Sequence, residues 1–330
     1  MSNMDREERL ERFRNIVKIA IDLPKQAQIK QWIRNAIDIG CCGKEARSLT
    51  LLGPTGTGKS TLLKEIVDEY PAEQRDRYLY HPVLYVEIPP QSTLKALAIA
   101  ILKALGDVPS NRSVSEYTHI VTRTLARAAP KLLILDEIQH IVSAGNKRAN
   151  AYASGDLIKS ILNAAVCPVI LAGQPEGAEV VDTNSQSERR NGWSERLEPF
   201  DWFKQADRDI YQSFLYMYEE RMGLPAPSNL FDDDMAFRLW IASDGLIGKT
   251  TKWLQMAAEM ALVERSSPLP CLSQELLAEA FERGQVRAER RQPNPFRSDK
   301  HSLKVLPAPT TEKLSLPRPR KTDQALKELL

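Results

Sequence analysis

One short segment constrains the fold of this 330-residue chain more than any other: the glycine-rich loop GPTGTGKS at residues 53–60. The apolar run Ser48–Leu52 precedes it and an amphipathic run at residues 62–67 follows it, which predicts a strand before the loop and a helix after it. In that setting the glycines let successive backbone N–H groups converge on a phosphate, and the helix adds its positive end. The pattern therefore predicts a nucleotide-binding α/β fold, with a plain surface turn as the weaker alternative.

The loop also predicts individual ligand contacts. Lys59 is expected to reach the terminal phosphates of a nucleoside triphosphate. The Ser60 hydroxyl is expected to complete the shell of a Mg2+ ion, because that ion prefers oxygen ligands and keeps most of its waters. The residues predicted to hold the nucleotide are Gly53, Pro54, Thr55, Gly56, Thr57, Gly58, Lys59, Ser60 and Thr61.

A second signature lies at residues 131–137, KLLILDE. A continuous apolar run is typical of a strand buried on both faces of a parallel sheet, and this one ends in two carboxylates. Asp136 fits the role of holding Mg2+ through water, and Glu137 is placed to orient and activate the attacking water. Acidic residues also end strands as helix caps, but a position about 75 residues after a phosphate-binding loop favours the chemical role.

Two further kinds of side chain are candidates for the same site. Gln174 follows the apolar strand expected at residues 168–173, where it either senses the γ-phosphate and positions the water or caps a turn. An arginine from a neighbouring subunit can stabilise charge on the γ-phosphoryl group, although for each arginine an ordinary surface ion pair is the alternative. Arg196 is expected just before the last short strand, and the candidates in order of preference are Arg196, Arg190 and Arg189.

After residue 207 the apolar residues follow a helical period throughout. Lys249 falls in the first turn of the third expected helix, from where its side chain can fold back onto the phosphates. A cation is not favoured at a helix start, which hints at a purpose, and an ordinary exposed lysine is the alternative. The glycine and proline positions delimit four helices at residues 207–222, 232–243, 249–265 and 273–287.

The remaining segments give less specific predictions. Residues 5–38 predict two helices broken near Pro24, which pack either on the nucleotide face or on a neighbouring subunit. Helices are also expected at residues 93–105 and 115–129, whereas residues 72–77 and 143–154 are expected to form polar loops.

Charge and composition limit the cellular setting. The net charge is only +2, yet residues 283–330 hold twelve Lys or Arg against five Asp or Glu. Such a basic segment contacts nucleic acid or an acidic partner, or is simply a solvated tail. No apolar run approaches the roughly 18 residues of a membrane-spanning helix, and the charged start lacks an apolar signal segment, so a cytoplasmic protein is expected.

Together these parts resemble an AAA+ ATPase over about residues 20–287, and within that superfamily the nearest likeness is to the TniB/TnsC group of transposition regulators. The segments that carry the likeness are residues 53–60, 86–106, 133–140, 173–176 and 245–249. The expected organisation is an N-terminal helical lead-in at 1–40, an α/β AAA+ parallel-sheet domain at 41–206, a helical lid at 207–290, and a basic, proline-rich, disordered tail at 291–330.

The resemblance implies an ATP- and Mg2+-dependent ATPase that forms a ring or filament of identical subunits on double-stranded DNA. In that group the oligomer links a target-site selector protein to the transposase, each nucleotide lies between two subunits, and ATP hydrolysis drives disassembly. The implied DNA contacts are mainly to the phosphate backbone. The candidates for these contacts are Lys95, Lys103, Lys147 and Arg148.

Two departures and two competing functions stay open. Gln174 stands where many AAA+ proteins have Asn or Thr, and position 249 has lysine rather than arginine. One alternative function is a helicase-loader-like remodeller that acts mainly on a protein partner. The other is a nucleotide-gated scaffold with negligible turnover, in which the tail from Gln292 onward docks partners.

Overall fold

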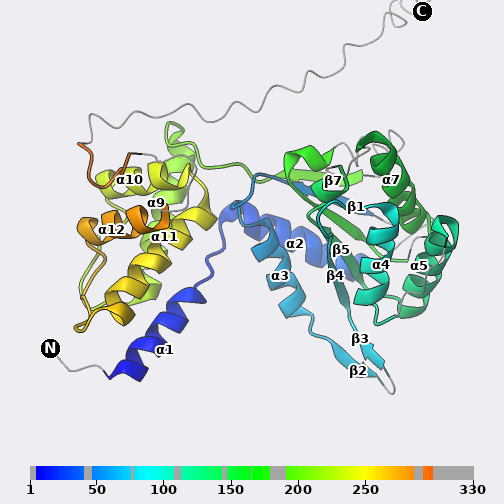
Figure 1. The fold of residues 1–330 in the computed structure, drawn as a ribbon, viewed down its shortest axis with the longest axis horizontal. Coiled ribbons are helices and arrows are strands. Elements are labelled where there is room, and N and C mark those ends of the chain that lie inside the picture. Colours follow the sequence, from blue (N-terminus) through cyan, green and yellow to red (C-terminus); the bar gives the residue numbers. More distant parts are fainter. Residues whose placement is uncertain are drawn as a thin grey trace, which may run out of the picture.

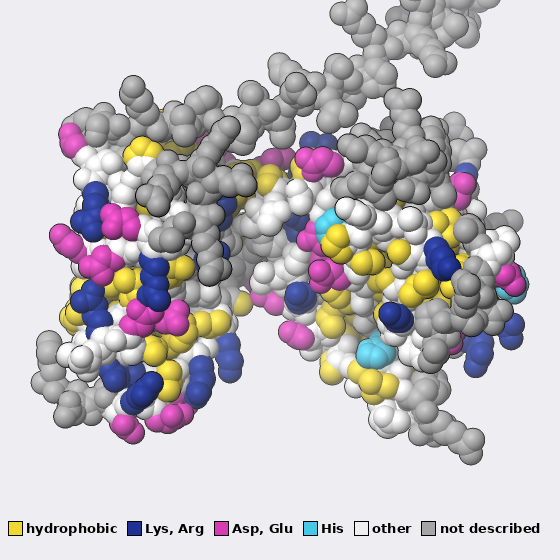
Figure 2. All heavy atoms as spheres, in the orientation of Figure 1, with side chains coloured by type: hydrophobic (Ala, Val, Ile, Leu, Met, Phe, Trp, Pro, Cys, Tyr) yellow, Lys and Arg dark blue, Asp and Glu magenta, His cyan; other side chains and the backbone are white. Residues whose placement is uncertain are grey.

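The structure is a computed structural model that describes residues 5–40, 47–75, 78–107, 113–142, 147–164, 166–178, 191–285 and 293–299. An α/β domain and a helical domain lie side by side (Figure 1), and the face shown in Figure 2 has a deep notch between them. Two described chain segments, residues 18–23 and 197–204, connect the domains. None of the described helices has the length and apolar character needed to cross a membrane.

A parallel five-stranded sheet forms the centre of the α/β domain, in the order β4-β5-β6-β1-β7. All residues of β1, β5 and β6 are buried, as the continuous apolar runs predicted. The strands are β1 (Ser48–Leu52), β4 (Val83–Glu87), β5 (Leu132–Asp136), β6 (Val169–Gly173) and β7 (Asn191–Arg196). The predicted parallel-sheet α/β core is confirmed.

Helices cover both faces of this sheet (Figure 1). The helices of this domain are α2 (Pro24–Ile39), α3 (Lys59–Glu69), α4 (Leu94–Ala104), α5 (Val114–Ala128), α6 (Gln139–Val142), α7 (Lys147–Asn163) and the 3-10 turn η1 (Pro175–Gly177). Successive strand residues point to opposite faces, so Leu133 enters the core under α4, α5 and α7, whereas Ile134 enters the core under α2 and α3.

Three local predictions were wrong. Residues 72–77 were expected as a loop, but β2 (Glu73–Arg75) pairs with β3 (Tyr78–Tyr80) in a hairpin, where the Arg75 guanidinium lies 3.5 Å from the centre of the Tyr80 ring. Residues 147–154 belong to α7, because alanines at alternate positions favour a helix despite the polar composition. The last strand ends at Arg196 instead of starting after it, since β7 pairs along the whole of β1.

The helical domain consists of α9 (Gln205–Met222), α10 (Asp233–Ser243), α11 (Ile247–Glu259) with its π-helical continuation η2 (Met260–Glu264), and α12 (Gln274–Gln285). Its core also contains Ile16 of α1 (Arg6–Val17), which packs beside α11 and η2. The two N-terminal helices therefore separate: α1 joins the helical domain, and α2 joins the α/β domain.

Residues 293–299 pack against the helical domain, although the proline-rich composition after residue 291 predicted no packed structure. Phe296 is buried beside the Phe281 ring, with 6.1 Å between ring centres. Arg238 donates hydrogen bonds to the carbonyl oxygens of Pro295 at 2.5 Å and Ser298 at 2.8 Å. An ion pair between Arg297 and Glu282 at 2.5 Å and a hydrogen bond from Gln274 to the Phe296 carbonyl oxygen at 2.6 Å also hold this short segment. The rest of the predicted tail lies outside the described residues.

Candidate nucleotide site

The glycine-rich loop leaves the carboxyl end of β1 and leads directly into α3. Gly56 and Gly58 both have φ of +90°, a conformation that side chains with a Cβ atom rarely adopt. A Cβ atom on Gly53 would collide with the carbonyl oxygen of Leu197, which crosses the loop at the start of the interdomain segment. The sequence pattern is therefore matched by a backbone that requires glycine at these three positions.

Lys59 is the first residue of α3 and is only 6% exposed. Its Nζ donates hydrogen bonds to the carbonyl oxygens of Gly53 at 2.6 Å and Pro54 at 2.9 Å. Burial lowers the pKa of Lys59, while the negative charges of Asp136 and Glu137 act in the opposite direction. The loop therefore encloses a buried ammonium group close to the carboxyl edge of the sheet.

Asp136 ends β5 and is 1% exposed. Its Oδ1 accepts a hydrogen bond from the backbone N–H of Glu137 at 2.8 Å, and its Oδ2 accepts one from the Tyr85 hydroxyl of β4 at 2.7 Å. Burial, followed by the hydrogen bond to Asp136, raises the pKa of Tyr85, so the phenol stays protonated and keeps donating. The carboxylate is thus held in one orientation at the edge of the sheet.

Glu137 begins a turn that links two loops of the site. Its φ is +63°, which is unusual for a residue other than glycine. Its carboxylate accepts a hydrogen bond from Nε2 of Gln139, whose Oε1 accepts the backbone N–H of Gln174 at 2.9 Å. Gln174 is half-buried and caps η1 at the carboxyl end of β6. The structure therefore brings Glu137 and Gln174 together through Gln139.

The helical domain contacts the glycine-rich loop directly. The backbone N–H of Gly248, in the first turn of α11, donates to the carbonyl oxygen of Gly56 at 2.8 Å. Lys249 follows in the same turn, and its half-exposed ammonium forms an ion pair with Asp244 at 2.7 Å. Lys249 thus lies beside the loop, as the sequence predicted for its position in the first turn, but its charge is paired with a carboxylate of the same domain.

Of the three arginine candidates, only Arg196 lies among the described residues. It is exposed at the end of β7, and its carbonyl oxygen accepts a hydrogen bond from Nζ of Lys25 at 2.5 Å. Arg189 and Arg190 lie outside the described part of the chain. An exposed side chain at the edge strand is available to another molecule, and no described contact assigns Arg196 to the nucleotide of its own chain.

The four candidate DNA contacts belong to two helices. Lys95 and Lys103 are both exposed on α4. Lys147 and Arg148 open α7, where the backbone is described and the side chains are not. Since α4 and α7 cover the same face of the sheet, the four positions belong to one layer of the domain.

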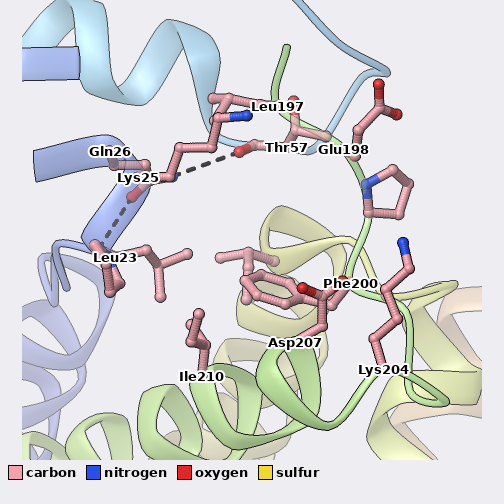
Figure 3. Close-up of a pocket in the computed structure, with 14 residues that line it drawn as sticks. Leu23, Lys25, Gln26, Thr57, Leu197, Glu198, Phe200, Lys204, Asp207 and Ile210 are labelled. Carbon is pink, nitrogen blue, oxygen red and sulfur yellow. Dashed lines mark hydrogen bonds between the residues drawn. The ribbon is translucent and has the colours of Figure 1, made fainter. Parts of the chain in front are cut away.

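A pocket of about 300 Å³ adjoins the glycine-rich loop (Figure 3). Leu23, Phe200 and Ile210 point toward it, and Thr57 of the loop forms part of its wall. Gln26, from the start of α2, donates a hydrogen bond to the Thr57 carbonyl oxygen at 3.5 Å. The pocket therefore presents apolar side chains from three distant chain segments next to the phosphate-binding loop.

A family model described as "Bacterial TniB protein" matches residues 20–200, which is more than half of the chain. The chain belongs to the TniB family. The match includes the glycine-rich loop, the β5 carboxylates and β7, and it ends before the helical domain. A comparison with curated proteins found no match for this TniB-family chain.

The chain is also similar to solved structures at 14–16% sequence identity. The Aeropyrum pernix ORC1 protein in complex with DNA has a TM-score of 0.58 and 15% identity, covering 82% of this chain and 69% of ORC1. CDC6P from Pyrobaculum aerophilum has a TM-score of 0.57 and 14% identity, with 81% and 70% covered. The ADP form of A. pernix ORC2 has a TM-score of 0.51 and 16% identity, with 82% and 72% covered. These neighbours show that the TniB-family chain has the AAA+ fold.

Sequence reasoning missed several residues of the site. The sequence patterns assign no role in the site to Tyr85 or to Gln139, because the contact of each depends on which strands are neighbours. The pocket was missed for the same reason, since Leu23, Phe200 and Ile210 are distant in sequence.

Proposed function

We propose that this TniB-family protein is an ATPase that binds ATP and Mg2+ and uses ATP hydrolysis to control its assembly on double-stranded DNA. The observation that carries the proposal is that the buried Lys59, in the loop after β1, lies at the same carboxyl edge of one parallel sheet as Asp136 and Glu137 at the end of β5. A cation enclosed by a glycine-rich loop and two carboxylates at the end of a nearby strand provide the charges that phosphoryl transfer to water needs.

The ATP molecule would lie between the two domains. The triphosphate would occupy the loop from Gly53 to Thr61 and replace the carbonyl oxygens that now accept from Lys59. The pocket beside Thr57, which has both apolar and polar residues in its walls, has the position to take the base. Lys249 would exchange Asp244 for a phosphate oxygen. These contacts involve both domains, so the bound nucleotide would affect their relative orientation.

The oxygen donors present fit a Mg2+ ion. The Asp136 carboxylate already has its orientation fixed by Tyr85 and the Glu137 N–H, and each oxygen retains lone pairs for a water or an ion. Ser60, next to Lys59 in the first turn of α3, would add its hydroxyl. Bound Mg2+ would neutralise charge on the phosphate oxygens. Glu137 would orient the attacking water. Gln174, in the loop after β6, would sense the γ-phosphate and help to position that water.

A subunit of the same kind would complete the site. Arg196 is our first candidate for an arginine that reaches the γ-phosphate of a neighbour, because its side chain is exposed at the edge strand; Arg190 and Arg189 follow. Such sharing would make ATP binding favour a ring or filament of identical subunits, and hydrolysis would favour its dissociation.

The assembled protein would act in the cytoplasm during DNA transposition, as a link between a target-site selector and the transposase. Support for this role comes from membership of the TniB family and from the resemblance of the sequence to the TniB/TnsC regulators. The exposed lysines of α4, with Lys147 and Arg148 of α7, are the proposed contacts to the DNA backbone. Backbone contacts of this kind predict binding that depends little on sequence and strongly on salt.

Imaging and sedimentation of the protein with short duplex DNA test the proposal. With ATP or a slowly hydrolysed ATP analogue we expect DNA-dependent oligomers that ADP does not support and that weaken steeply with added salt. ATP hydrolysis without DNA-dependent assembly at any salt concentration would reject the DNA role and favour a remodeller that acts on a protein partner. Assembly without hydrolysis would instead favour a nucleotide-gated scaffold.

A further inference from the structure

Gln139 occupies a position that neither the glycine-rich loop nor the carboxylate pair requires. The residue is 6% exposed and lies in the first turn of α6. Its amide is used at both ends: Nε2 donates to the Glu137 carboxylate and Oε1 accepts the Gln174 N–H at 2.9 Å. The backbone donor of Gln174 fixes which end of the amide faces which partner. A buried glutamine thus connects the loop after β5 with the loop after β6.

The surrounding backbone makes room for this side chain. A Cβ atom on Gly173 would collide with Oε1 of Gln139 and would lie 2.9 Å from the backbone nitrogen of Ile138, so this arrangement favours glycine as the last residue of β6. Gly177 is restricted in the same way, because its Cβ would lie 2.5 Å from Cγ1 of Ile138. Gly173 at the end of β6 and Gly177 in η1 therefore leave room for the segment Ile138–Gln139.

The turn before Gln139 is also specialised. Glu137 has φ of +63°, and a side chain in this region costs free energy that the surroundings must offset. Backbone contacts hold the turn: the Ile138 N–H donates to the Ala172 carbonyl oxygen at 3.0 Å, and the His140 N–H donates to that of Glu137 at 3.0 Å. The direction in which the Glu137 side chain leaves the strand is therefore set by the same segment that carries Gln139.

We propose that Gln139 is a positioning residue that holds the Glu137 carboxylate toward the phosphate site and couples it to the loop carrying Gln174. The proposal rests on the ATPase function proposed above. A change of the Gln174 loop on binding or losing the γ-phosphate would then move the Gln139 amide, and with it the carboxylate that orients the water.

The place of Glu137 in the fold supports this orientation. Glu137 follows the last residue of β5, and the glycine-rich loop follows β1, so both leave the same carboxyl edge of the parallel sheet. A carboxylate held at this edge lies on the side of the sheet where the phosphates are expected.

Two substitutions in the full-length chain separate the two hydrogen bonds. Gln139→Met keeps the length of the side chain and removes both bonds. Gln139→Glu keeps an acceptor for the Gln174 N–H but replaces the donor to Glu137 by a second carboxylate. We expect both to lower the kcat for ATP on the order of ten-fold or more, with the KM and the affinity for a fluorescent ATP analogue within about two-fold of the parent. Gln31→Met makes the same chemical change at an exposed position on α2 and is the matched control.

The Glu137→Gln background distinguishes positioning from a general structural effect. If Gln139 acts through Glu137, adding Gln139→Met to Glu137→Gln changes the residual rate by less than about two-fold, because the effects of residues that act as a unit are not additive. A second loss on the order of ten-fold in that background would overturn the proposal.

Other outcomes are equally decisive. Faster hydrolysis by Gln139→Met than by the parent would mean that Gln139 sequesters Glu137, which contradicts the proposal. Parental kcat in either variant would contradict it while leaving the ATPase function intact. A parent chain that binds ATP but hydrolyses none, with or without duplex DNA, would reject the ATPase function and this inference with it.

Discussion

The carboxyl edge of the sheet and the first turn of α11 both adjoin the glycine-rich loop, but they are built differently. At the sheet edge, Lys59 and Asp136 are buried, and each makes short hydrogen bonds to fixed partners. At α11, one backbone hydrogen bond joins Gly248 to the loop, and Lys249 forms a half-exposed ion pair. In the proposed ATPase, the sheet edge would hold the reacting groups in fixed positions. The helical domain would change its contact with the loop when the nucleotide binds or is hydrolysed.

The comparison predicts that the largest effect comes from the sheet edge. Lys59→Ala removes a cation with two hydrogen bonds in the loop, and we expect ATP affinity to fall on the order of 100-fold, measured by calorimetric titration. Lys252→Ala, an exposed lysine of α11, is the control and should bind as the parent does. ATP affinity retained in Lys59→Ala would show that the buried lysine has no part in phosphate binding.

A pair of glycine substitutions compares the rigidity of the two regions. A Cβ at Gly53 would collide with the backbone of Leu197, whereas a Cβ at Gly248 would lie 3.0 Å from the Gly56 carbonyl oxygen. We expect Gly53→Ala to lower the free energy of unfolding by about 2 to 3 kcal/mol and to impair ATP binding. Gly248→Ala should stay within about 1 kcal/mol of the parent, because the lid can shift by tenths of an ångström.

Thermal and urea unfolding with and without ATP measure both variants. In Gly248→Ala, ATP should still bind, but its effect on assembly should weaken, because the contact between α11 and the loop is displaced. Equal losses of stability in Gly53→Ala and Gly248→Ala would remove the distinction between a fixed edge and an adjustable lid.

The smallest effects are expected at the ion pair of the helical domain, where only the loss of Lys249 should weaken ATP binding. Lys249→Ala removes a cation that would reach the phosphates, so ATP should bind about two- to five-fold more weakly. Asp244→Asn releases Lys249 from its present partner, so ATP should bind as well as in the parent or up to about three-fold more tightly. Weaker binding in both variants would mean that the pair has a structural role only.

A second contrast, between the core strands and the segments that connect them, explains how much of the fold the sequence could predict. The strands β1, β5 and β6 were predictable because a parallel-sheet strand is a local apolar run, and the glycine-rich loop lies between one of them and a helix. The hairpin β2–β3 and the early start of α7 were not predictable in this way, because the polar composition of both segments indicated loops. Strand pairing in the hairpin and the alanines of α7 decide the structure instead. Local patterns therefore predicted the core better than the connections.

Within the site, the side chains that would touch the nucleotide could be inferred from motifs, whereas those that hold them could not. Tyr85 reaches Asp136 because β4 and β5 are in register, and Gln139 reaches Gln174 because β5 and β6 are neighbours. Register and strand order depend on the packing of the whole domain. The helical domain's hydrogen bond to Gly56 depends likewise on how the two domains meet.

The central claim is that hydrolysis directed by Glu137 releases an assembly that ATP binding forms. The most direct test follows Glu137→Gln and the parent on duplex DNA, with ATP turnover and oligomer size recorded in the same sample after ATP is added. We expect Glu137→Gln to bind ATP and assemble like the parent, to hydrolyse ATP on the order of 100-fold more slowly, and to remain on the DNA while the parent dissociates. Parental turnover in Glu137→Gln, or dissociation at the parental rate, would contradict the claim.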